Sequence, residues 1–589
     1  MRLRLRLVCC CAVVALAATF APAASAAPPA PFGHACSPLD GALFCPAADD
    51  AARVPSFDGV PIDVDVWLPP TGDGPFPTIA MLHGFGQSKT AFEAPGADPS
   101  YNASAFARAG YAVVVPTARG FGRSCGAPDS RTIGCERGWT HVGDQRYEAR
   151  DVQSLLGLLV DQGVARPDAL GVTGISYGGG TSLQLAVLGD RVRLPDGATA
   201  PWSSPAGTPL AIAAAWPRWP WSDLADALVP NGRLGPRTYA SPIGVELQAY
   251  TGLLSALGST GGFLAQPGVD PGADITSWAQ RLDRGEPYGT DVTAALDELH
   301  AFHGALNIPL EKPTTPLLIQ AGWTDDLFPV GQTLRIYDAL RGVDRQAPVA
   351  LQLGDLGHAR GANHPDDVRA FDAQGLAFLD QRLSGAVQPA AANAAPGTVT
   401  ALRQTCPRTA PSGGPAIVAS SFAGLARGSL VFRHRAAQRV TSSGGDAALS
   451  QKLSPLALDP CKPFPVDIAR GTAIASVRSR GFTLLGRTRV RADVAVRGRD
   501  ALVVGRLWDV DPAHGRQRLV DRGVVRLRSK RTLSFALNGN AYRFAPGHLV
   551  QLELVGRDAP TYRAANDDFS VTARNLTVTL PTRERRAGR

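Results

Sequence analysis

The sequence predicts an α/β fold followed by an all-β region, on the basis of three features. Apolar runs such as 77–84 and 315–322 alternate with amphipathic helical segments up to about residue 385, which is typical of a parallel sheet covered by helices. Beyond a linker, short alternating strands separated by Gly, Asn and Asp turns predict an antiparallel sandwich or jelly roll. The third feature is a serine at a predicted corner between a strand and a helix.

This corner lies in the segment LGVTGISYGGGTSLQLAV, residues 170–187. Gly174, Ser176 and Gly178 fit the G-x-S-x-G nucleophile elbow, in which the serine takes a strained conformation that only small neighbours allow. The residues before Ser176 predict a buried parallel strand, and 182–188 predict a helix. We therefore expect the Ser176 hydroxyl at the carboxyl edge of the sheet.

A second match to the same spacing is formed by Gly122, Ser124 and Gly126. The strand before it ends near Thr117, no helical pattern follows, and Cys125 is expected to form a disulfide. An elbow needs the strand, the turn and the helix together. Ser176 is therefore the predicted nucleophile.

The acid and the base of a catalytic triad are expected on loops after later core strands. The strand 315–322 is followed by WTDD, which predicts Asp325 as the acid, with Asp326 as the alternative. The last core strand leads to DLGH, which predicts His358 as the base, with His364 as the fallback. The order Ser, Asp, His is that of the α/β-hydrolase fold.

A glycine-rich turn, HGFG at 83–86, directly follows the strand 77–84. Such a turn frees backbone N–H groups that can stabilise an oxyanion. We expect the N–H groups of Phe85 and Tyr177 to form the oxyanion hole, and His83 to support the turn rather than act as the base.

The mainly helical segment 216–308 separates two core strands, and its length predicts a cap over the site. Trp216, Trp219 and Trp221 stand at its entrance, where they either line a substrate pocket or pack the cap. Two late histidines of the cap, His300 and His303, are expected on the surface or in packing.

The N-terminus carries Arg2, Arg4 and Arg6, then an apolar run and Ala-Ser-Ala, which predicts a secretory signal and a secreted, extracellular protein. A membrane anchor, the alternative, needs about 20 uninterrupted apolar residues. The expected organisation is a signal peptide at 1–26, a hydrolase core at 27–215 and 309–385 interrupted by the cap at 216–308, a linker at 386–399, and a jelly-roll domain of galactose-binding-like type at 400–589.

Six cysteines remain after the predicted signal, and an even number in an exported chain predicts disulfides. Closeness in sequence favours the pairs Cys36–Cys45, Cys125–Cys135 and Cys406–Cys461. A zinc site is the alternative, but the chain has no paired C-x-x-C or H-x-x-x-H spacing. We expect no metal and no cofactor.

The net charge of +8 comes from the C-terminal third, where residues 400–589 hold 32 Lys and Arg against 13 Asp and Glu. Arginines at alternating positions, including Arg487, Arg489, Arg491 and Arg526, predict a solvated strand face. This pattern argues against nucleic-acid recognition and is compatible with contact to anionic cell-envelope polymers.

Five motifs carry a family resemblance: HGFGQSK at 83–89, RGFGRSCG at 119–126, GISYGG at 174–179, GWTDDLF at 322–328, and the pair Gly357-His358. With these motifs the chain resembles the X-Pro dipeptidyl-peptidase and cocaine-esterase family of serine hydrolases. The resemblance implies a helical cap and a C-terminal jelly roll with a strand like GRLWDVD at 505–511. One residue departs from it, because the esterase branch has an oxyanion-binding tyrosine where this chain has Phe85.

The predicted function is therefore hydrolysis of a small-molecule ester or a short peptide amide through an acyl-enzyme. The alternative is a non-catalytic secreted binding protein that keeps the hydrolase scaffold and acts through its basic β domain.

Overall fold

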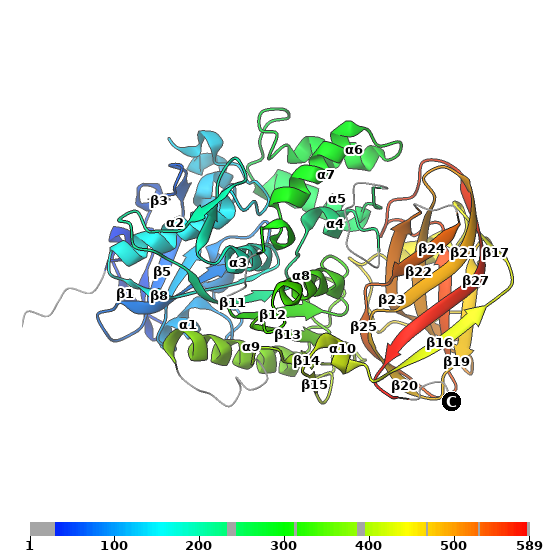
Figure 1. Cartoon of the computed structure of the whole chain (residues 1–589). Helices are drawn as coiled ribbons and strands as arrows, with labels where there is room; N and C mark the ends of the chain where they lie inside the picture. The colour runs from blue at the N-terminus through cyan, green and yellow to red at the C-terminus, as the bar shows by residue number, and fades with distance from the viewer. Residues whose placement is uncertain are drawn as a thin grey trace, which may run out of the picture.

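The computed structural model describes residues 30–232, 243–310, 315–385, 395–466, 469–527 and 531–585. The predicted signal peptide and most of the predicted linker lie outside these residues. Figure 1 shows a large sheet with helices on both sides, and beside it a separate all-β region near the C-terminus.

The described residues form an eleven-stranded sheet that is parallel from β7 to β14 and antiparallel at both ends. In spatial order its strands are β1 (Ser37–Leu39), β2 (Ala42–Cys45), β5 (Val64–Leu68), β7 (Ala112–Pro116), β6 (Phe76–Leu82), β8 (Ala165–Ile175), β11 (Ile212–Arg218), β12 (Leu317–Gly322), β13 (Val349–Gly354), β14 (Val399–Ala401) and β15 (Ile417–Ala419). Every residue of β7, β12 and β13 is buried, as expected for parallel strands covered on both faces. Two short pairs stand apart: β3 (Val54–Pro55) with β4 (Pro61–Ile62), and β9 (Arg191–Arg193) with β10 (Thr199–Pro201).

Helices cover the two faces of this sheet with separate apolar clusters. One face packs against α2 (Glu148–Asp161), α3 (Tyr177–Leu188) and α8 (Val330–Val343). The other face packs against α1 (Ala103–Arg108) and α9 (Pro365–Leu379). This arrangement leaves the carboxyl ends of the parallel strands for the loops that carry the site.

A helical insertion lies between β11 and β12 and comprises α4 (Leu224–Leu228), α5 (Gln248–Gly261), α6 (Ile275–Arg284) and α7 (Thr290–Phe302). The predicted boundary at 215/216 is wrong by three residues, because β11 continues to Arg218, paired with Ile175 and Gln320. Trp216 therefore belongs to the sheet.

In the C-terminal β region, the described residues form two antiparallel sheets. One consists of β16 (Gly428–His434), β17 (Gln438–Thr441), β20 (Phe482–Gly486), β21 (Arg489–Gly498), β24 (Thr532–Ala536), β25 (Asn540–Phe544) and β27 (Phe569–Thr582); the other of β18 (Phe464–Pro465), β19 (Ala473–Arg478), β22 (Leu502–Asp511), β23 (Arg516–Arg526) and β26 (Leu549–Val555). Both sheets contribute to one buried apolar cluster, which also includes residues of the helical insertion. Two short helices, α10 (Phe422–Leu425) and α11 (Ala447–Lys452), interrupt the strands.

The large sheet extends further along the chain than the sequence indicated. Val399 pairs with Leu351 of β13, and β14 then pairs with β15. The predicted domain boundary at residue 400 therefore cuts β14, a strand of the core sheet. A strand of only three residues is too short to give a periodic signal in the sequence.

The described part of the chain contains three disulfides, Cys36–Cys45, Cys125–Cys135 and Cys406–Cys461, which is the pairing that closeness in sequence favoured. The last one joins the segment after β14 to the segment after α11. Among the described residues, no helix has the length and apolar character needed to cross a membrane.

The arginines of the β region fall into two groups. Arg489 and Arg491 are exposed, as predicted, whereas Arg487 of the same predicted face is only partly exposed and its Nε donates to the Leu537 carbonyl at 3.0 Å. The interpretation of Arg526 as a solvated residue is wrong, because it is 3% exposed and forms an ion pair with Glu286 of the helical insertion. Alternation along a strand identifies a face, but it does not show whether water or another part of the chain covers that face.

Candidate active site

Ser176 occupies the sharp corner between β8 and α3, with φ 55° and ψ −109°. Two glycines make this corner sterically accessible. A methyl group on Gly178 would lie 2.0 Å from the Leu82 carbonyl oxygen, and one on Gly174 would lie 2.5 Å from the Gly178 carbonyl oxygen. The G-x-S-x-G spacing therefore reflects close backbone approach on both sides of the serine.

A chain of hydrogen bonds joins three side chains that the sequence analysis singled out. The Ser176 hydroxyl lies 2.7 Å from His358 Nε2, and His358 Nδ1 lies 2.7 Å from Asp325 Oδ2. Since Nδ1 faces a carboxylate, Nδ1 carries the proton in the neutral ring and Nε2 accepts from the serine. The three residues follow β8, β12 and β13, whose carboxyl ends meet at one edge of the sheet.

The Asp325 side chain is completely buried and held by backbone donors. Its Oδ1 accepts hydrogen bonds from the N–H groups of Leu327 at 3.0 Å and Phe328 at 2.9 Å, and its Oδ2 accepts one from the His358 N–H at 3.2 Å. Gly357 has φ +105°, and a methyl group there would lie 2.3 Å from Asp325 Oδ2. Only glycine allows the histidine loop to approach the carboxylate this closely.

Asp326, the alternative acid, points to a different set of partners. It forms a bidentate ion pair with Arg360 at 2.8 and 3.1 Å, and Arg522 of β23 lies 3.6 Å away. Burial raises the pKa of Asp326, but Arg360 and Arg522 outweigh this and hold the pKa below its usual range. Asp326 therefore links the histidine loop to the β region. The carboxylate that is hydrogen-bonded to the His358 ring is that of Asp325.

Ser124, the serine of the second G-x-S-x-G match, and His364, the fallback base, do not contact the Ser176–His358–Asp325 chain. Ser124 is buried, donates to the Thr117 carbonyl at 2.7 Å and accepts from the Asp63 N–H at 2.9 Å. His364 has no exposed surface and lies between the Ala410 carbonyl and Asp355.

The N–H groups of Phe85 and Tyr177 have no hydrogen-bond acceptor within the part of the chain that the structure describes. The turn that holds Phe85 is fixed by His83, whose Nε2 accepts from the Ala118 N–H at 2.9 Å and whose Nδ1 donates to the Gly84 carbonyl at 2.8 Å. Burial lowers the pKa of His83 to about 4, so this ring is neutral near pH 7. The Gly178 N–H donates to the His83 carbonyl at 2.9 Å and joins this turn to the elbow.

The phenol of Tyr177 anchors the loop before α2. Its oxygen accepts from the Gly143 N–H at 3.0 Å and donates to Glu148 at 3.1 Å. Burial and the Glu148 carboxylate raise the pKa of Tyr177 well above its usual value. Glu148 also accepts from two N–H groups of this loop, a role that its position at a helix start did not indicate.

The three tryptophans have different environments. Trp216 is a residue of β11, and its side chain is completely buried on one face of the sheet beside Tyr101, so the alternative in which it lines a substrate pocket is wrong. Trp221 is 2% exposed and packs between Tyr177 and Phe328. Only Trp219 is partly exposed, with its ring edge-on to His358 at 6.1 Å between centroids.

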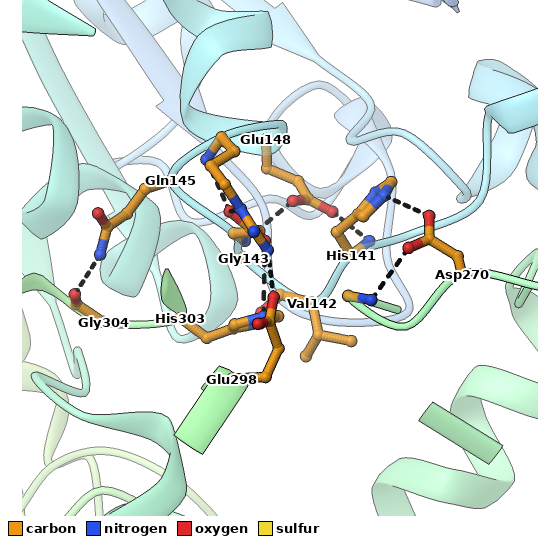
Figure 2. A network of polar contacts seen from close by, with 12 residues as sticks. His141, Val142, Gly143, Gln145, Glu148, Asp270, Glu298, His303 and Gly304 are labelled. Atoms are coloured by element: carbon orange, nitrogen blue, oxygen red, sulfur yellow. Dashed lines mark hydrogen bonds and ion pairs between the residues drawn. The ribbon is translucent and has the colours of Figure 1, made fainter. Parts of the chain in front are cut away.

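Figure 2 shows a buried polar network between the loop before α2 and the end of α7. Within the described residues, Asp144, Glu298 and His303 form the one cluster with metal-ligand spacing. Arg146 already donates to both carboxylates, so a cation of the protein itself occupies the space between them. His303 has no exposed surface and is a packing residue, while His300 pairs with Asp223 at 2.7 Å.

Solved structures share this architecture. An α-amino acid ester hydrolase aligns with 15% identity and a TM-score of 0.55, over 96% of this chain and all of that one. A CocE/NonD family hydrolase from Staphylococcus aureus aligns with 14% identity and a TM-score of 0.57, over 92% and 94% of the two chains. An aminopeptidase from a marine sediment Thaumarchaeota archaeon aligns with 14% identity and a TM-score of 0.55, over 93% and 97%. These alignments establish an α/β-hydrolase-like fold with a separate C-terminal β region.

A serine on a nucleophile elbow in this fold defines the class of serine hydrolases. Residues 58–192, which include the elbow, match the family model described as X-Pro dipeptidyl-peptidase (S15 family). The match confirms the resemblance indicated by the sequence motifs and identifies the chain as a serine hydrolase. No curated protein sequence matches this chain.

Proposed function

We propose that this protein hydrolyses acyl esters or short peptide amides through an acyl-enzyme on Ser176, with His358 as the base and Asp325 as the acid. The hydrogen-bond chain from the Ser176 hydroxyl through His358 to Asp325, with two contacts of 2.7 Å, is the observation that carries the proposal.

In the first step Ser176 Oγ attacks the substrate carbonyl while its proton passes to His358 Nε2. Asp325 keeps the ring in the tautomer with Nδ1 protonated and stabilises the imidazolium. The imidazolium then protonates the leaving alcohol or amine, and water releases the acyl group by the same route. Backbone donors fix both oxygens of Asp325, so its orientation does not change during these steps.

The N–H groups of Phe85 and Tyr177 are the proposed oxyanion donors. Each such donor typically contributes about 3 kcal/mol to the stability of the transition state. Tyr177 is the first residue of α3, so its N–H has no acceptor inside the helix and benefits from the helix dipole.

A fluorophosphonate probe tests the nucleophile directly. We expect the wild-type protein to be labelled, Ser176→Ala to be unlabelled, and the matched control Ser124→Ala to be labelled like the wild type. Unlabelled wild type, or equal labelling of Ser176→Ala, would contradict the proposal and favour a non-catalytic binding protein.

A second experiment identifies the type of bond that the protein cleaves, an ester or a peptide amide. A p-nitrophenyl acyl ester and an Ala-Pro anilide, assayed at equal enzyme concentration, separate esterase from X-Pro peptidase action. Turnover of both would assign a broad acyl hydrolase, and turnover of neither by a protein that the probe labels would point to another acyl group.

We also propose that the protein is exported. The predicted signal at 1–26 and the three disulfides support this, since disulfides persist in oxidising compartments. The mass of the protein recovered from the culture medium should correspond to loss of about 26 residues, whereas a full-length intracellular product would contradict export.

A further inference from the structure

A cavity of about 420 Å³ lies beside the triad, on the face of the sheet covered by α1 and α9. Its walls come from the loop between β6 and α1, the ends of β8 and β11, and the first turn of α9. A volume of this size is in the range of cavities that bind small ligands. None of the steps proposed above uses it.

The cavity is a direct neighbour of the reacting groups. Ile175, which lines it, precedes Ser176, and the Ser176 N–H donates to the carbonyl of Arg218, another lining residue, at 3.0 Å. Trp219 joins the cavity to the base, because it lines the cavity and its ring meets the His358 ring edge-on at 6.1 Å between centroids. A group bound in the cavity would therefore lie on the His358 side of the nucleophile.

Trp219 has an unusual backbone conformation and an indole N–H without a hydrogen-bond acceptor among the described residues. Its φ is +52°, which is strained for any residue other than glycine, and its indole N–H is buried. Strained residues and unused buried donors are concentrated at binding sites, where a ligand completes their contacts. Trp219 is outside the apolar cluster of the insertion and packs instead against Leu356, Phe371 and Leu402, whose side chains offer no acceptor to the indole N–H.

The chemistry of the walls defines the ligand. Phe92, Tyr101, Ile175, Trp219 and Val368 provide apolar and aromatic surface, and the Tyr101 hydroxyl is already bonded to Thr173 at 2.7 Å. Arg218 is neutralised by Asp372 at 3.0 Å. Arg369, at the outer end of this wall, is exposed and pairs with Asp366. Each arginine of the wall has its own carboxylate. Asp98 also lines the cavity, but it is exposed and accepts hydrogen bonds from the N–H and the hydroxyl of Ser100. The buried side chains of the wall are apolar or have their charge paired, so they offer contact to an uncharged apolar group.

We propose that this cavity binds the leaving group of the substrate, and that this group is an uncharged aryl or branched alkyl alcohol. The inference rests on the proposed function. Ser176 Oγ bonds to the acyl carbon, and when the ester bond from that carbon to the alkoxy oxygen then breaks, the proton on His358 Nε2 passes to the departing alkoxide. The leaving group must therefore lie beside His358, whereas Phe85 and Tyr177, the proposed oxyanion donors, do not line this cavity.

The test compares kcat/KM for methyl, phenyl and 2-naphthyl acetate, which share one acyl group. Val368→Phe fills the cavity and should lower kcat/KM for 2-naphthyl acetate about tenfold further than for methyl acetate. Ala91→Phe, on the loop after β6, fills the same cavity from another element and should have the same effect. Val343→Phe, at an exposed position of α8 outside the cavity, is the matched control and should leave all three values unchanged.

A second series separates the two ends of the ester. Phenyl acetate, butyrate and octanoate vary the acyl chain on one alcohol, and the filling variants should keep the wild-type ratios among them. A loss that follows acyl length, or one that is equal for all acetates in both filling variants, would overturn the assignment. Labelling by the fluorophosphonate probe distinguishes this outcome from failure of the proposed function, in which the wild type itself would not react.

Discussion

Asp325 and Asp326 are consecutive residues, both buried, yet they face different regions of the molecule. Asp325 faces the edge of the core sheet, where backbone N–H groups and the His358 ring surround it. Asp326 faces the β region, where the guanidinium groups of Arg360 and Arg522 surround it. The sequence WTDD distinguishes them only by spacing.

The difference shows how one loop can serve two regions. A carboxylate that contacts an imidazole can orient a proton-transferring ring, whereas one enclosed by guanidinium groups can only hold elements together. Arg360 lies two residues after His358, so the ion pair with Asp326 ties the histidine loop to the aspartate loop. The β region closes this arrangement through Arg522.

The largest effect is expected for Asp325, the aspartate that contacts His358, and it concerns turnover. Asp325→Asn keeps the shape of the residue but favours the wrong tautomer of His358, and we expect turnover to fall by about 10⁴. Steady-state kinetics on a p-nitrophenyl ester measures this fall, with unfolding midpoints as the control. Equal turnover of variant and wild type would assign the acid elsewhere.

Asp326→Asn should instead lower stability. Loss of one member of a buried ion pair leaves the other charge uncompensated, at a cost of about 3–5 kcal/mol in the free energy of unfolding. Denaturant unfolding measures this, and the fraction that remains folded should still be labelled by the probe. If the folded fraction loses about 10⁴ in turnover, the roles of the two aspartates are exchanged.

A pH experiment compares these paired charges with His83, a buried group that has no counterion among the residues that the structure describes. The pKa of His83 is lowered to about 4 by burial, so between pH 6.5 and 4 the unfolded chain binds a proton that the folded chain does not. Its contribution to stability is present above pH 6.5 and is lost as the pH falls, by about 3 kcal/mol. His83→Gln has no titrating ring and should show a correspondingly weaker loss in thermal unfolding; an identical pH profile would contradict this.

The smallest effects concern the arginines that join the β region to the insertion. Arg526→Ser leaves Glu286 with Arg563 as its partner, and we expect a loss of about 2 kcal/mol in the free energy of unfolding. The exposed Arg489 is the matched control, and Arg489→Ser should stay within about 0.5 kcal/mol of the wild type. Equal effects would mean that this ion pair adds nothing to the contact between the two regions.

The sequence predicted those features that depend on local pattern. Ser176 follows a buried strand and precedes a helix, and Asp325 and His358 each lie on a loop after an apolar strand. The sequence alone therefore predicts that all three lie at the carboxyl edge of the sheet. Trp216 and Arg526 were misinterpreted because what covers a face is decided by segments far away in the sequence. The network around Glu148 and the cavity beside Trp219 depend on several loops at once, which no spacing in one segment reveals.

The pairing of β13 with β14, and of β14 with β15, bears on how the enzyme can be divided. A fragment that stops in the linker would lose both outer strands and expose the backbone of β13, whose residues are apolar apart from Gln352 and are all buried in the intact chain. Such a strand readily recruits strands from other molecules, so this truncation should precipitate. A cut placed beyond Ala419 would keep it covered.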